Sequence, residues 1–155
     1  MRVRAYTAEE AAEILETRAT LEGLVARHAA RRIDAAGEGT LAAILSEMQR
    51  CHDGGDLLAY SQFNAQFHKT ILAIAEHETA AMLLAVLQTQ AVRYQFRTVL
   101  EPGRITRSLG EHRAIFDAIR THDEAAAARA MHAHIAAVVD TVRSIGGASH
   151  ALASM

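Results

Sequence analysis

The chain has 155 residues, half of them hydrophobic, and its 16 basic and 18 acidic residues give a formal charge of −2. This length suits one domain with a sizeable core, and the interspersed charges lack the basic stripe of a nucleic-acid binder. A single cysteine, Cys51, excludes an internal disulfide framework, and no apolar run approaches the roughly 18 residues that a membrane-spanning helix needs.

Apolar periodicity and its punctuation predict six helical stretches, of which the first two fill the N-terminal third. Thr7 is a suitable N-cap for the first helix, expected over residues 7–32. Gly37 and Gly39 are expected to end that segment, because glycine is a poor helix former. The second helix is therefore predicted over residues 40–52.

The third and fourth helices follow the turn at Gly54-Gly55. The third is expected from Asp56 to about Glu76 and the fourth from Thr79 to about Val99. Six large residues make up the apolar pattern of the fourth helix: Met82, Leu83, Val86, Leu87, Val92 and Phe96.

The last two helices lie on either side of a short break near Asp123. The fifth is expected to begin at Thr106 or Ser108, and the sixth runs from its cap at Asp123 to about Ile145. Gly146-Gly147 is predicted to stop it. No stretch alternates with period two, so we predict no sheet. The expected fold is all-α, an antiparallel helical bundle with short connections.

Three of the nine histidines are predicted to face the core. Asn64 and His68 are four residues apart on the third helix, a spacing that places two side chains on one face. His112 shares a face with apolar residues of the fifth helix. On the sixth helix we choose His134 rather than His132, because the apolar neighbours lie on the face of His134. Burial is costly for histidine unless each ring finds a partner.

Convergence of three such histidines on one point would create a metal site. Neutral imidazole nitrogen suits zinc, nickel, copper or iron, and three histidines with one amide oxygen would leave a coordination position open. The competing interpretation is that each inward histidine is simply hydrogen-bonded, which is the usual case for any one alone. Five further histidines are expected to be solvated: His28, His52, His77, His122 and His150.

The same residues carry a family resemblance. The segments Asn64-Ala-Gln-Phe-His68, Ser108-Leu-Gly-Glu-His112 and Met131-His-Ala-His134 occur in that order. Together they resemble the FCD domain, the C-terminal effector domain of FadR-type regulators in the GntR family of bacterial transcription factors. The resemblance runs from about Thr7 to Ile145. It implies an antiparallel bundle of six or seven helices around a central cavity that holds a metal and a ligand.

The resemblance also implies a ligand set and an effector. A divalent metal would be held by Asn64, His68, His112 and His134; zinc is the first choice, with nickel, manganese or iron as alternatives. Where the family often has aspartate, this chain has Asn64, whose neutral amide should weaken metal binding and leave the site more positive.

The implied effector is a small organic acid whose carboxylate reaches the metal. Arginines on the cavity wall would help to hold it, because a guanidinium grips a carboxylate through two hydrogen bonds. Arg18 matches the arginine of the family's first effector-domain helix. Arg93 and Arg97, four residues apart on the fourth helix, are further candidates by position, and the competing interpretation for each arginine is a solvated ion pair.

One departure concerns the DNA-binding part of these regulators. Residues 1–6 leave no room for the winged helix-turn-helix that precedes such a domain, so they are interpreted as a linker remnant, residues 7–146 as the effector domain and residues 147–155 as a flexible tail. The chain is either a fragment or a stand-alone module, and alone it should not bind an operator. We expect a cytoplasmic homodimer.

Two other functions compete with ligand sensing. A metal-dependent hydrolase would need a general base near a metal-bound water, but Glu111, adjoining His112, points about 100° away from it, and no other inward carboxylate is expected near the site. A metal-free helical interaction domain would make the histidines coincidental. Metal content and the response of thermal stability to zinc distinguish that domain from a sensor.

Overall fold

The computed structural model describes residues 5–154, except for the side chains of residues 89–93. All the regular structure in this part is α-helical, which confirms the predicted fold class. The six helices are α1 (Ala8–Arg32), α2 (Ala35–Gly54), α3 (Leu57–Ala75), α4 (Glu78–Val99), α5 (Arg104–Arg120) and α6 (Glu124–Ala153). Within the described residues, no helix is both long and apolar enough to cross a membrane.

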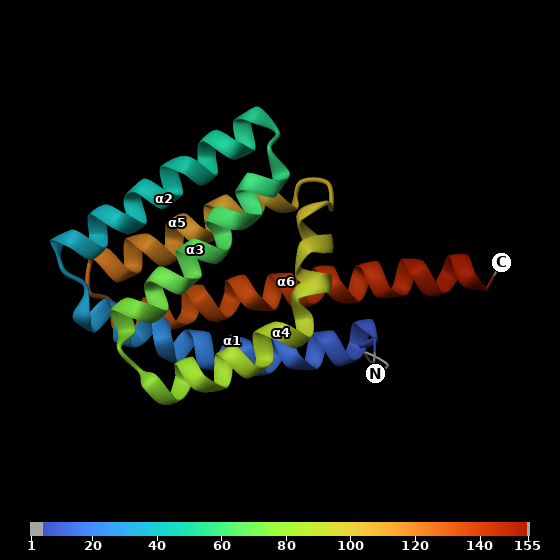
Figure 1. Cartoon of the computed structure of the whole chain (residues 1–155), viewed down its shortest axis with the longest axis horizontal. Helices are drawn as coiled ribbons and strands as arrows, with labels where there is room; N and C mark the ends of the chain where they lie inside the picture. Colours follow the sequence, from blue (N-terminus) through green and yellow to red (C-terminus); the bar gives the residue numbers. More distant parts are fainter. Residues whose placement is uncertain (1–4, 155) are drawn as a thin grey trace.

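The two longest helices, α1 and α6, lie side by side and run antiparallel (Figure 1). Ion pairs fix this register at both ends, Arg143 with Glu9 at 2.9 Å and Arg31 with Glu124 at 2.9 Å. Small side chains let the two backbones approach closely along the contact. The buried alanines of α1 are Ala11, Ala12, Ala19, Ala26, Ala29 and Ala30.

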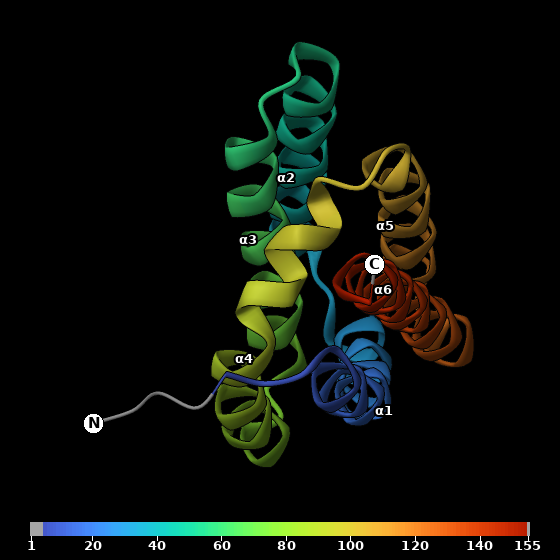
Figure 2. The ribbon, with the colours of Figure 1, turned by 90° about the vertical axis from the view of Figure 1, so that its right-hand side faces the viewer.

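The remaining helices complete the bundle around the α1–α6 pair. α2 packs against α3 and α5, and α4 contacts α1, α3, α5 and α6 (Figure 2). Tyr94 on α4 donates its hydroxyl hydrogen to the carbonyl of Tyr6 at 2.8 Å, which ties α4 to the segment before α1. In this arrangement, the inner faces of α3, α5 and α6 are turned toward one region, and α4 covers that region on one side.

The predicted start of α2 was wrong by about one turn. Asp34 caps this helix by accepting a hydrogen bond from the backbone N–H of Gly37 at 2.8 Å, and Gly37 and Gly39 both lie within the helix. A Cβ at Gly37 would come within 3.1 Å of the side chains of Ile33 and Ile74. Glycine therefore permits a close approach of α2 to α3 here. Likewise α5 begins at Arg104, earlier than predicted, after the left-handed residue Gly103.

The apolar pattern of α4 does not form a buried stripe. Met82, Leu83, Val86 and Phe96 are 42–63% exposed, whereas Ala80 and Leu84 are buried. The helix is apolar on more than one face, so periodicity could not select the face that meets the core. The side chain of Val92, which belongs to the predicted pattern, lies outside the described residues.

The predicted end of the sixth helix was also wrong, because α6 continues through Gly146-Gly147 to Ala153. Gly146 faces the start of α1, where a Cβ would overlap the methyl group of Ala8. Gly147 has open space around its Cβ position. The first glycine is therefore required by packing, and the second is not.

These adjacent glycines provide a matched pair of substitutions. Gly147→Ala should raise the free energy of unfolding by up to about 1 kcal/mol, because alanine is the better helix former. Gly146→Ala gains the same propensity but should be destabilising by about 1–3 kcal/mol, because its methyl group overpacks the contact with Ala8. Urea unfolding of the two variants measures the difference; equal effects would contradict the packing of α6 against α1.

Candidate metal centre

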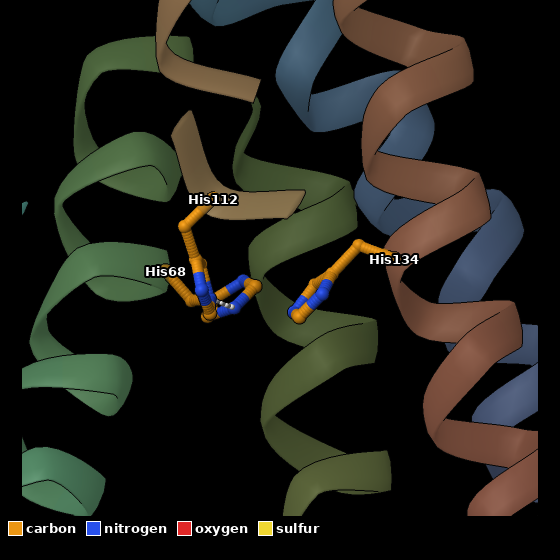
Figure 3. Close-up of side chains that lie close together, drawn as sticks. All are labelled: His68, His112 and His134. Atoms are coloured by element: carbon orange, nitrogen blue, oxygen red, sulfur yellow. Dashed lines mark hydrogen bonds between the residues drawn. The ribbon is translucent and has the colours of Figure 1, made fainter. Parts of the chain in front are cut away.

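Three histidines from three different helices meet inside the bundle. His68 on α3, His112 on α5 and His134 on α6 point toward one another (Figure 3). One ring nitrogen from each lies within 4.8 Å of the others. His112 is fully buried and His134 is 3% exposed, whereas His132, the rejected alternative on α6, is exposed. The convergence predicted from sequence is thus present.

The spacing of these nitrogens fits a small divalent cation. The Nε2 atoms of His68 and His112 are 3.3 Å apart. Nitrogens bonded to a tetrahedral zinc at about 2.0–2.1 Å would be roughly 3.3–3.4 Å from each other. The same two nitrogens are also within hydrogen-bond distance of each other. The donor set therefore fits zinc or a similar ion.

Each histidine also faces a polar group with its other ring nitrogen. Nδ1 of His134 lies 2.6 Å from a carboxylate oxygen of Glu111, and Nδ1 of His112 lies 3.2 Å from the hydroxyl of Ser108. Nδ1 of His68 lies 3.7 Å from Glu22. The partners at Nδ1 orient the rings of His112 and His134 and leave their Nε2 atoms to the cluster, which is the usual arrangement around metal-bound histidine.

Glu111 is itself held in place by Arg104. The guanidinium donates two hydrogen bonds to its carboxylate, at 3.0 and 2.8 Å. Burial alone would raise the pKa of Glu111, but the hydrogen bonds from His134 and Arg104 lower it to about 2. Glu111 is thus a permanent anion that orients His134 and a weak proton acceptor.

Burial keeps His68 and His112 neutral. It is the main cause that lowers the pKa of His68 to about 4 and that of His112 well below 6.5, and the neighbouring His134 lowers both further. Neutral imidazole is the form that binds metals, so these rings are ready to bind near pH 7.

A second buried cluster adjoins His68. Nη2 of Arg18 donates to Glu22 at 2.8 Å, and both side chains are less than 10% exposed. Four buried polar atoms here have no hydrogen-bond partner in the structure: Nε and Nη1 of Arg18, the second carboxylate oxygen of Glu22 and Nδ1 of His68. Burial alone would raise the pKa of Glu22, but His68 and Arg18 lower it overall.

These two clusters line a cavity of about 820 Å³. Arg18, Asn64, His68 and His134 all contribute to its wall, so four predicted site residues meet there. His112 lies directly behind His68 and His134, with ring centroids 5.4 and 4.4 Å from theirs.

Of the two arginines predicted on α4, the structure describes the side chain of Arg97 alone. The guanidinium carbon of Arg97 lies 5.9 Å from the ring centroid of Tyr94, and the described residues that line the cavity do not include Arg97. The side chain of Arg93 lies outside the described residues.

Sequence reasoning missed the carboxylates. Glu111 was expected to point away from the site and no other inward carboxylate was expected, yet Glu111 reaches His134 and Glu22 faces His68. The spacing of four residues between Arg18 and Glu22 was a signal that went unused. Both carboxylates are paired with arginine, which makes them poor general bases for hydrolysis.

Comparison with known proteins agrees with this geometry. A family model described as FCD domain matches residues 13–137, which is most of the chain and includes all three clustered histidines. No curated protein matches the chain.

Proposed function

The chain belongs to the FCD domain family, the regulatory effector-binding domains of GntR-type transcription factors, and we propose that it senses a small carboxylate through a bound divalent metal, most readily zinc. The observation that carries this proposal is the position of Arg18. Its Nε and Nη1 are buried, unpartnered and beside the histidine cluster, in the wall of the same cavity. Buried donors in this state need an acceptor, and the carboxylate of a small ligand supplies a charged one.

The charge of the buried residues supports an anionic effector only when the metal is present. Arg18 and Arg104 are balanced by Glu22 and Glu111, and burial keeps His68 and His112 neutral. A bound dication adds two positive charges, which favours an anion in the cavity. Asn64, one helical turn before His68, would contribute a neutral amide oxygen and leave that positive charge undiminished.

The regulatory step follows from the family. Ligand binding would favour one packing of the helices over another, and in a two-fold regulator this changes the separation of two DNA-binding heads. We infer a homodimer and a cytoplasmic setting on the same grounds.

Metal binding is tested by thermal unfolding of chelator-treated protein. Zinc at 100 times its Kd should stabilise the fold by about 2.7 kcal/mol and raise Tm by roughly 5–10 °C. A melting temperature that ignores both zinc and chelator would favour the metal-free interaction domain instead.

Carboxylate binding is tested with acetate as the probe. Acetate should bind the zinc-loaded protein and not the metal-free protein, as measured by calorimetry. Arg18→Gln should weaken acetate binding by about 10–100-fold, because it removes charge-assisted hydrogen bonds, and leave zinc content unchanged. Acetate binding that is independent of both zinc and Arg18 would refute the sensing mechanism.

A further inference from the structure

The cavity has much more space than a short acid needs. Its volume of about 820 Å³ lies within the range of roughly 300–1,000 Å³ that holds drug-sized ligands. A carboxylate placed between Arg18 and the histidines would fill only one part of it. The chemistry of the remaining wall therefore carries information about the rest of the effector.

The wall has exposed polar side chains at its mouth and a buried apolar stretch further in. Gln62, Gln66, Lys69 and Gln88 all line the cavity but are exposed, which places them at its mouth. The interior contains a set of residues that we call the apolar arm. It consists of Val25, Ile71, Leu72, Ala81 and Leu84, from α1, α3 and α4.

The apolar arm begins where the carboxylate would bind. Val25 follows Glu22 by three residues on α1, and Ile71 follows His68 by three residues on α3, so each lies one helical turn further along the same face. Val25 and Ile71 are at most 2% exposed, and Leu84 on α4 is 6% exposed.

The buried cations limit the effector to one charged end. Arg104 is already paired with Glu111 through two hydrogen bonds, whereas Nε and Nη1 of Arg18 have no partner. The third cation among the described residues that line the cavity, Lys69, is exposed at the rim. A second carboxylate inside the apolar arm would be buried without a partner, which is costly.

We propose that the effector is a monocarboxylate with an apolar body: its carboxylate pairs with Arg18 beside the three histidines, and its hydrocarbon part lies in the apolar arm. This inference rests on the proposed function and adds the chemical class of the ligand. An effector of this class would distinguish this chain from a sensor of short hydroxy acids, sugar acids or dicarboxylates.

The test is a chain-length series measured by calorimetry on the zinc-loaded protein. Acetate, butyrate, hexanoate and octanoate should bind with affinities that rise about fourfold per buried methylene until the arm is full. Octanedioate has the same length as octanoate but a second carboxylate, and it should bind at least tenfold more weakly. Equal affinities across the series, or octanedioate binding as tightly as octanoate, would overturn the proposal.

Two neighbouring leucines on α4 provide the matched variants. Leu84→Asn should remove most of the gain from acetate to octanoate and leave acetate affinity unchanged, because Leu84 lines the arm and not the carboxylate site. Leu83→Asn, at a position that is 45% exposed and not among the residues lining the cavity, should keep the full gain.

The series in the unaltered protein decides the question even if Leu84→Asn fails to fold. Zinc-dependent binding of acetate with no gain from chain length would refute the apolar arm and leave the sensing proposal intact. Absence of any zinc-dependent binding, by acetate or octanoate, would refute both.

Discussion

Replacement of His112 by alanine should lower the affinity for zinc by more than about 100-fold. Loss of a partner in the outer shell of a metal site already costs about 10–100-fold, and His112 is placed to be a direct ligand. It is fully buried, its Nε2 lies 3.3 Å from that of His68, and its ring centroid lies 4.4 Å from that of His134. Competition against a chromophoric chelator measures the change.

His132→Ala is the matched control, because it removes the same kind of side chain from the same helix that carries His134. His132 is exposed and takes no part in the cluster, so zinc affinity should stay within about twofold of the unaltered protein. His112→Gln, which keeps a polar group near Ser108, guards against a folding defect. Equal losses at His112 and His132 would mean that the three histidines do not hold the metal.

The histidines could be predicted because they depend on helical geometry alone. A residue on a helix faces the core when its neighbours three and four positions away are apolar, and this rule selected His134 over His132 correctly. Thr7 and Asp123 fix the starts of α1 and α6 by capping. Capping depends on a few adjacent residues, so it can also be predicted from the sequence. These features need no knowledge of how helices pack.

The errors concern contacts between helices. Gly37 and Gly146 look like helix breakers in sequence, but each lies inside a helix where another side chain approaches closely: a Cβ would be crowded at Gly37 and would overlap Ala8 at Gly146. The tilt that brings Glu111 to His134 depends on the packing of α5 against α6. Periodicity gives the direction of a side chain around its own helix and says nothing about the neighbour that it reaches.

The second large effect is expected from the buried pair of Arg18 and Glu22. In metal-free protein, Arg18→Met should lower the free energy of unfolding by about 3–5 kcal/mol, because it leaves the carboxylate of Glu22 buried without a counter-charge. The double variant Arg18→Met/Glu22→Leu should recover most of that loss, because two apolar side chains of similar size need no hydrogen bonds. Urea unfolding in the presence of a chelator measures all the variants.

The exposed pair of Arg31 and Glu124 is the control for this comparison of single and double variants. It has comparable hydrogen-bond lengths, 3.0 and 2.9 Å, but its side chains are 54% and 33% exposed, so its coupling energy should not exceed about 1 kcal/mol. Zinc should reduce the cost of Arg18→Met, because a cation on His68 places positive charge beside the second oxygen of Glu22. If Arg18→Met lowers the free energy of unfolding no more than Arg31→Met does, water must reach Glu22. The unpaired donors of Arg18 would then need no carboxylate.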